Sequence, residues 1–194
     1  GKSSDGCGLL IKKPEEFFNH CAKELNIDLG KNYAFGTIFL PRNKSQQKKI
    51  KETFFFQIKK LRLEVLGWRN VPIDKKVCGK EALSSLPDIQ QIIISGPNDL
   101  QENEFEKKLY IARLQIEKIL DDPDLYICSM SSKVISYKGL IVSENIQKFY
   151  PDLVHSKMKT SLCVFHQRFS TNTLPQWKLA QPFRHLAHLS LIHI

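Results

Sequence analysis

The residue types best suited to chemistry gather near the end of the chain, in His166-Gln167-Arg168-Phe169-Ser170-Thr171-Asn172-Thr173. An arginine at the end of a predicted buried strand suits a small carboxylate, because its planar fork can donate two parallel hydrogen bonds. Hydroxyl groups in the following turn, such as that of Thr171, would complete the shell around this anion. The alternative is structural: Arg168 pairs with an internal acid and the hydroxyls cap a turn. The residues alone leave both interpretations open.

The other reactive side chains indicate no further catalytic or metal site. His185, His188 and His193 have no cysteine or acid close by as a further ligand, so we predict no metal site. A Ser–His–Asp triad lacks any supporting nucleophile motif. Cys7 and Cys163 are conceivable nucleophiles, but Cys163 falls within a predicted strand, where a free cysteine is usually an inert small apolar residue.

The chain carries 29 Lys and Arg against 20 Asp and Glu, and residues 42–62 hold eight bases against the single acid Glu52. Clustered cations suit nucleic acid, because they release counterions from phosphate. The apolar residues of this stretch recur at helical spacing, however, which favours an amphipathic helix whose lysines face water. The Phe54-Phe55-Phe56 cluster is more typical of a core contact than of a base-stacking platform. A nucleic-acid-binding module remains the alternative.

Composition sets the broad class. With 194 residues, 42% of them apolar, the chain has room for one domain or two small ones. Its longest apolar runs are a few residues, far short of a membrane span, and its start does not resemble a signal peptide. The five cysteines are odd in number and widely spread, which favours a reducing compartment. We therefore predict a cytoplasmic protein.

Periodicity predicts mixed strands and helices that do not alternate regularly enough for a doubly wound parallel sheet. A polar loop is expected over 70–87, and a hairpin of the strands 125–129 and 133–137. The other predicted elements are strands at 9–11, 33–40, 63–68, 89–95 and 160–169, and helices at 14–25, 42–62, 102–120 and 143–149.

The candidate anion site also carries a family resemblance. Residues 166–173, with Pro175, Trp177 and Ala180-Gln181-Pro182-Phe183-Arg184, closely resemble the class II glutamine amidotransferase domain of the glutamate synthase large subunit. Other segments resemble this family in the same order: Asp5-Gly6-Cys7-Gly8, 35–41, Leu66-Gly67-Trp68-Arg69-Asn70-Val71-Pro72, 105–110, 126–132, Tyr137-Lys138-Gly139 and Phe149-Tyr150-Pro151-Asp152-Leu153. The resemblance thus runs from Asp5 to His188.

The resemblance implies an α+β fold of the N-terminal-nucleophile hydrolase type, an αββα sandwich of antiparallel sheets, present here as an incomplete domain over residues 1–188. In such enzymes an N-terminal cysteine attacks the glutamine amide, with its own α-amino group as base, to give glutamate and ammonia. The ammonia reaches 2-oxoglutarate at a distant site that uses FMN and an iron–sulfur cluster. The implied partners are glutamine, downstream synthase domains and a small reductase subunit, without nucleic acid or membrane, and this chain itself is expected to hold no cofactor.

The resemblance also assigns the site residues. Arg168 would bind the glutamine α-carboxylate, Thr171 and Asn172 would lie beside it, and His166 would support the strand end that carries the arginine. Within the enzyme class, the alternative is another class II amidotransferase, such as an amidophosphoribosyltransferase. A catalytically inactive scaffold is a separate alternative.

Two departures from the family pattern predict an inactive fragment. No cysteine here can inherit the nucleophile's role, since Cys7 replaces an alanine typical of the family's glycine-rich turn. Where the family continues after His188 with Asn-Gly-Glu-Ile-Asn, this chain reads Leu-Ser-Leu-Ile-His-Ile. Loss of one oxyanion-hole donor costs about 2.7–4 kcal/mol of barrier. We expect residues 189–194 to be a non-native tail and the chain to show no glutaminase activity.

Overall fold

Seven strands form two antiparallel sheets in the computed structural model, which describes residues 6–169 and 174–183. One sheet has the order β6-β1-β7 and the other the order β3-β4-β2-β5. The α+β class is thereby confirmed. The strands are β1 (Cys7–Lys12), β2 (Asn32–Leu40), β3 (Glu64–Asn70), β4 (Asp88–Gly96), β5 (Tyr126–Ile127), β6 (Val134–Gly139) and β7 (Cys163–His166).

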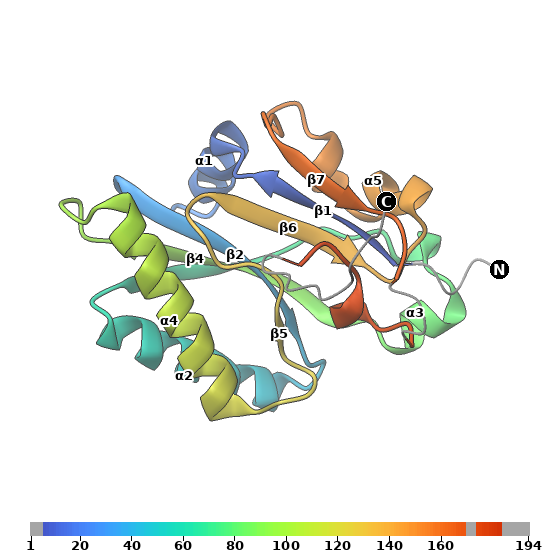
Figure 1. Cartoon of the computed structure of the whole chain (residues 1–194), viewed down its shortest axis with the longest axis horizontal. Coiled ribbons are helices and arrows are strands. Elements are labelled where there is room, and N and C mark those ends of the chain that lie inside the picture. The colour runs from blue at the N-terminus through green and yellow to red at the C-terminus, as the bar shows by residue number, and fades with distance from the viewer. Residues whose placement is uncertain (1–5, 170–173, 184–194) are drawn as a thin grey trace, which may run out of the picture.

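Helices α2 (Lys44–Lys60) and α4 (Glu102–Leu120) cover one face of the four-stranded sheet (Figure 1). The side chain of Asn43 starts α2 by accepting a hydrogen bond from the backbone N–H of Gln46. Both helices turn one apolar stripe towards the sheet, as their spacing predicts. The buried stripe residues are Ile50, Phe54 and Ile58 on α2, and Phe105, Leu109, Ala112 and Ile116 on α4.

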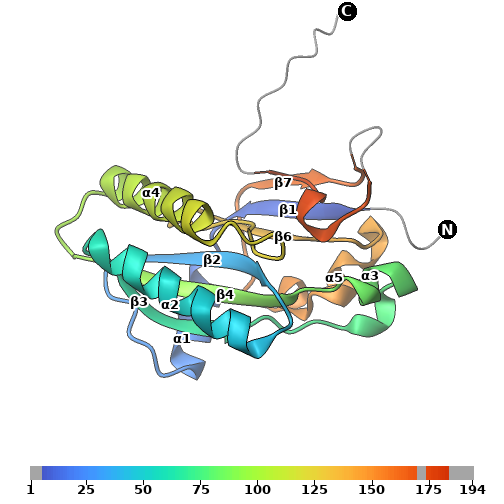
Figure 2. The same ribbon diagram turned by 90° about the horizontal axis from the view of Figure 1, so that it is seen from below.

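A second core joins the opposite face of this sheet to the three-stranded sheet, and Figure 2 shows the two sheets as separate layers. Helix α1 (Glu15–Glu24) adds Phe17, Phe18 and Cys21 to this core. The short helix α5 (Ile146–Phe149) adds Phe149. Further short 3-10 turns lie at Lys75–Val77, Ser143–Asn145, Pro151–Val154 and Trp177–Leu179. No helix among the described residues is long and apolar enough to cross a membrane.

The predicted hairpin of strands 125–129 and 133–137 is wrong. β5 pairs with β2 in the larger sheet, whereas β6 pairs with β1 in the smaller one. Between them, the N–H groups of Cys128 and Ser129 both donate to the carbonyl of Thr37, which holds the chain at the edge of β2. The polar turn therefore passes from one sheet to the other instead of folding back on itself.

Two further predictions need correction. The expected buried strand at 160–169 is a four-residue edge strand, β7, whose Val164 and Phe165 side chains are exposed. It pairs with β1 on one side only within the described residues. The predicted loop at 70–87 contains the helix α3 (Lys80–Ser84). Arg42 binds the carbonyls of Leu83 and Leu86 at the end of this helix, both at 2.6 Å.

Candidate functional site

The strand that carries the predicted anion site is aligned by a row of residues across the three-stranded sheet. Gly8 of β1 is paired with Lys138 of β6 on one side and with His166 of β7 on the other. Residues opposite one another in an antiparallel sheet present their side chains on the same face. Lys138, Gly8 and His166 therefore share one face, which we call the site row.

Residues 174–183, which we call the covering segment, lie against Gly8 and Lys138 of the site row. A Cβ atom at Gly8 would lie 2.5 Å from the carbonyl oxygen of Gln181 and 2.4 Å from the Cβ of Lys138. Only glycine allows the backbone of this segment to approach so closely. A Cβ at Gly139 would likewise lie 2.6 Å from the ring of Trp177. Gly8 and Gly139, which belong to two of the family-like motifs, thus leave room for the covering segment.

The covering segment is anchored at Trp177. This indole is buried, and its N–H donates to the carbonyl of Ala82 at 3.1 Å. A cavity of about 520 Å³ lies beside it, between residues 84–87 and 175–178. Arg168 is not among the residues that line this cavity.

Arg168 follows β7 by two residues and is exposed. Within residues 6–169 and 174–183 it forms no ion pair and no hydrogen bond. The structural alternative, in which it pairs with an internal acid, therefore has no counterpart among the described residues. The next residue, Phe169, packs its ring where a Cβ at Gly6 would lie, 2.3 Å away.

The other predicted site residues are placed only in part. His166 is half-buried at the end of β7. Thr171 and Asn172 lie outside the described residues, as do His185, His188, His193 and the tail 189–194. The structure brings His166 and Arg168 to one strand end.

Lys138 is a site-row residue to which the sequence assigned no role. It is fully buried, and burial lowers the pKa of its ammonium to about 8. Nζ donates to the hydroxyl of Tyr126 at 3.2 Å and to the carbonyl of Lys178 at 3.1 Å. The motif Tyr137-Lys138-Gly139 was the signal that could have marked it.

Arg69 carries a second buried charge to which the sequence assigned no role. Arg69 of β3 binds Asp152 through two hydrogen bonds of 2.7 Å each. Tyr137 donates to the same carboxylate at 3.0 Å and accepts from Gln91 at 3.1 Å. Burial alone would lower the pKa of Arg69, but the hydrogen bonds and charge of Asp152 raise it above its ordinary value. This network joins the two sheets and accounts for Arg69 and Asp152 in their motifs.

A third polar cluster fixes the crossing between the sheets. The carboxylate of Glu106 on α4 accepts hydrogen bonds from the hydroxyls of Ser131 and Ser132 and from the N–H of Ser132. The hydroxyl of Ser129 accepts from the N–H of Ser136 at 3.0 Å. These contacts are structural, because they join the turn between the sheets to α4 and to β6.

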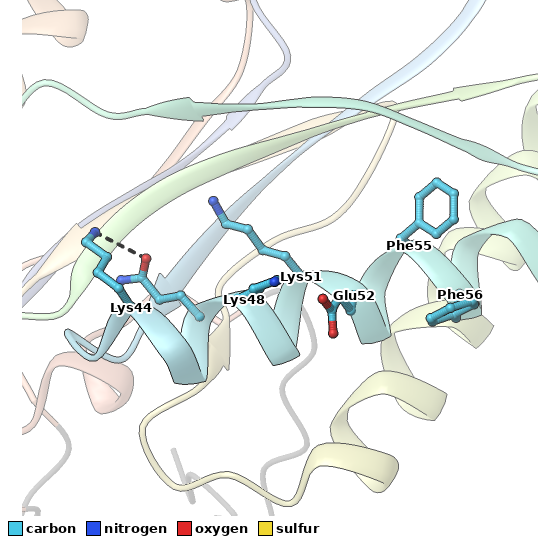
Figure 3. A pocket seen from close by; sticks show the side chains of 7 residues that line it. Lys44, Lys48, Lys51, Glu52, Phe55 and Phe56 are labelled. Carbon is cyan, nitrogen blue, oxygen red and sulfur yellow. Dashed lines mark hydrogen bonds between the residues drawn. The ribbon is translucent and has the colours of Figure 1, made fainter.

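The outer face of α2 carries most of the basic stretch. Its lysines are mostly exposed, as predicted for a solvated face. The predicted core contact of the phenylalanine cluster is right for Phe54, but Phe55 and Phe56 are 45% and 60% exposed. They line a shallow hollow of about 700 Å³ with Lys44, Lys48 and Lys51 (Figure 3). The turn of the helix places them away from the sheet, since only Phe54 continues the Ile50 to Ile58 stripe.

The cysteines are free and mostly buried. Burial raises the pKa of Cys21 to about 11 and that of Cys128 to about 12. Because the thiolate is the reactive form, these two are poor nucleophiles near neutral pH. Cys163 is exposed at the first residue of β7, so its expected interior position is wrong. Among the described residues no group of His, Cys, Asp or Glu side chains is arranged to hold a metal ion.

The sequence profile of the family described as "Glutamine amidotransferases class-II" matches residues 1–193. The chain belongs to the class II glutamine amidotransferases. The predicted family is thereby confirmed, and the site row lies where several motifs of this amidotransferase meet.

Similar proteins specify the resemblance further. The "Glutamate synthase [NADPH] large chain" of Azospirillum brasilense is 38% identical over 193 residues, which is 97% of this chain and 13% of that protein. The protein of the same name from Bacillus subtilis (strain 168) is 37% identical over 189 residues, 96% of this chain and 12% of that one. "Ferredoxin-dependent glutamate synthase 1, chloroplastic/mitochondrial" of Arabidopsis thaliana is 38% identical over 192 residues, again 96% and 12%. The chain spans about an eighth of the length of these relatives.

Proposed function

We propose that this amidotransferase chain provides the glutamine-binding part of the glutaminase domain of a glutamate synthase. The observation that carries the proposal is the exposed guanidinium of Arg168, which lacks an internal partner among the described residues. A guanidinium in this state can take the α-carboxylate of glutamine through two hydrogen bonds. The similar large chains named glutamate synthase support this substrate.

In the proposed mechanism this chain binds and orients glutamine. Arg168 holds the α-carboxylate, His166 supports the end of β7, and Thr171 and Asn172 complete the shell. A cysteine thiolate supplied from outside these residues attacks the carbonyl carbon of the side-chain amide and forms a C–S bond. The C–N bond then breaks, and the nitrogen takes the proton that the base had removed from the thiol and leaves as ammonia. Water then hydrolyses the thioester to glutamate. This division of labour predicts that residues 1–194 alone bind glutamine weakly and do not hydrolyse it.

The whole enzyme that we propose is cytoplasmic and completes the αββα sandwich around the two sheets described here. The free cysteines support a reducing compartment. Ammonia would pass to synthase domains of the same polypeptide that use FMN and an iron–sulfur cluster, with a small reductase subunit as a further partner. Among the described residues no group of His, Cys, Asp or Glu side chains is arranged to hold a metal ion, and the proposal assigns both cofactors to the other domains.

A chimera tests the proposal. Residues 6–188 would replace the matching part of the Azospirillum brasilense large chain, which supplies the nucleophile. We expect glutamine hydrolysis, and we expect Arg168→Gln to raise KM for glutamine at least tenfold, because a hydrogen bond to a charged group contributes about 1.5–3 kcal/mol. The control is Arg62→Gln, an exposed arginine at the end of α2. Equal KM values for these two variants would contradict the proposal, as would Arg168-dependent ammonia release by the 194-residue chain alone.

A further inference from the structure

Lys138 carries a buried positive charge without an acidic partner among the residues that the structure describes. Its side chain is 0% exposed, and no carboxylate of the described residues lies within 4.0 Å of its ammonium. Its neighbours are two oxygens and two rings. The oxygens belong to Tyr126 and Lys178, and the ring centroids of Tyr126 and Phe183 lie 4.4 and 4.6 Å from Nζ.

The covering segment provides half of these contacts. The carbonyl of Lys178 and the ring of Phe183 both belong to it, and Gln181 between them lies against Gly8. Removing the segment from the sheet would return the Lys138 ammonium to water. Docking of the segment and burial of the ammonium are therefore one event.

We infer that Lys138 is a positioning residue of the glutamine site, which holds the covering segment across the site row beside the strand end that carries Arg168. The inference rests on the proposed function. His166 occupies the same row two residues before Arg168, so a segment docked against Gly8 and Lys138 forms a wall on the sheet face that carries His166. Lys138 acts through this wall and does not itself contact the substrate.

Thermodynamic linkage predicts the direction in which docking of the covering segment changes with pH. Burial lowers the pKa of Lys138 from its ordinary 10.5 to about 8. The undocked state therefore binds more protons than the docked state between these two values, and docking strengthens as pH rises through this window. The limiting effect is about a tenfold fall in the undocked fraction for each pH unit above 8. Below pH 8 both states are protonated and the dependence vanishes.

The groups that face Lys138 do not mask this effect. Tyr126 and Cys128 lie on one side, and burial raises the pKa of both, to about 12 for Cys128. Arg113 and Glu117 of α4 pair with each other at 3.0 Å. Nζ of Lys178, on the covering segment, binds the carbonyl of Pro123 at 3.2 Å. A midpoint near pH 8 in this neighbourhood therefore reports on Lys138.

Trp177 provides the probe, because it belongs to the covering segment and is one of only two tryptophans in the chain. In a Trp68→Phe background, acrylamide quenching of Trp177 would be measured from pH 7 to 9.5. We expect quenching to fall about twofold or more with a midpoint near pH 8. Lys138→Met should abolish the midpoint, and Lys138→Arg, which stays charged, should keep the low-pH level throughout.

The matched control is Lys133→Met, a lysine directly before β6 whose side chain is 43% exposed, and it should keep the original curve. An unchanged curve in Lys138→Met or Lys138→Arg would overturn the inference, as would a pH-independent starting protein. If the methionine variant fails to fold by circular dichroism, the arginine variant decides alone.

The chimera links the inference to glutamine. We expect its KM for glutamine to fall as pH rises past 8, Lys138→Met to remove this dependence, and kcat to change little in either case. If Arg168→Gln leaves KM unchanged, the proposed function fails whatever Lys138 does. If Arg168→Gln raises KM and Lys138→Met keeps the original pH profile, the inference about Lys138 fails by itself.

Discussion

Two arginines of this chain occupy opposite situations. Arg69 has a side chain that is 12% exposed and holds the 4% exposed carboxylate of Asp152 through two short hydrogen bonds. Arg168 is exposed at a strand end and has no partner within the described residues. Both belong to motifs that resemble the same family, and residue type alone does not distinguish them.

The difference teaches which of the two can bind a ligand. The fork of Arg69 is already filled by a carboxylate of the same chain, so a free amino acid would have to displace Asp152 and leave it buried without its counter-ion. Arg168 has no such partner among the described residues, and the proposed function assigns its donors to the ligand. A closed arginine is part of the scaffold, whereas an open one is a candidate for recognition.

Breaking the closed pair should give the largest effect. Asp152→Asn removes the charge that neutralises Arg69 and leaves the guanidinium buried without its counter-ion. We expect the free energy of unfolding to fall by about 3–5 kcal/mol, measured by urea denaturation. The control is Glu16→Gln, which removes the exposed partner of Lys159 and should cost less than about 1 kcal/mol. Similar losses in the two variants would show that Arg69 is not closed in solution.

A smaller change sharpens the description of the closed site. Tyr137→Phe removes the hydroxyl that donates to Asp152 and accepts from Gln91. We expect a loss of about 1–3 kcal/mol, because buried polar groups then lack a partner. Combining it with Asp152→Asn should give less than the sum of the single losses, since both act on one network. Strict additivity in this double-mutant cycle would separate Tyr137 from the arginine pair.

The strongest sequence patterns predicted the fold well. The helix at 102–120 was predicted with its observed bounds, because its apolar stripe runs through five turns without a breaking residue. The strands at 125–129 and 133–137 were assigned to the wrong partners, because pairing depends on contacts far along the chain. β5 pairs with Ile38 and Phe39 of β2, nearly ninety positions earlier in the chain, and no local sequence pattern predicts that pairing.

The site was predictable to a lesser extent. Arg168 stands out by its motif, but the apolar residues before it do not reveal that β7 is an exposed edge rather than a central strand. The partner of Arg69 lies 83 positions away in sequence, so only the folded chain shows that this arginine is closed. The burial of Lys138 is not predictable from its strand pattern, because a lysine in such a pattern ordinarily lies on the solvent face.

The smallest expected effect on stability belongs to the open arginine. Arg168→Gln removes a charge that no described residue neutralises, so the free energy of unfolding should change by less than about 0.5 kcal/mol. The same urea titration that measures Asp152→Asn checks this, and the two variants together measure the contrast between the arginines. A loss above about 2 kcal/mol would mean that Arg168 has an internal partner in solution and is scaffold like Arg69. If the guanidinium of Arg168 is open, Arg168→Gln should leave the free energy of unfolding unchanged and still weaken glutamine binding in the chimera. The reason is that its interaction energy is realised only when the ligand is present.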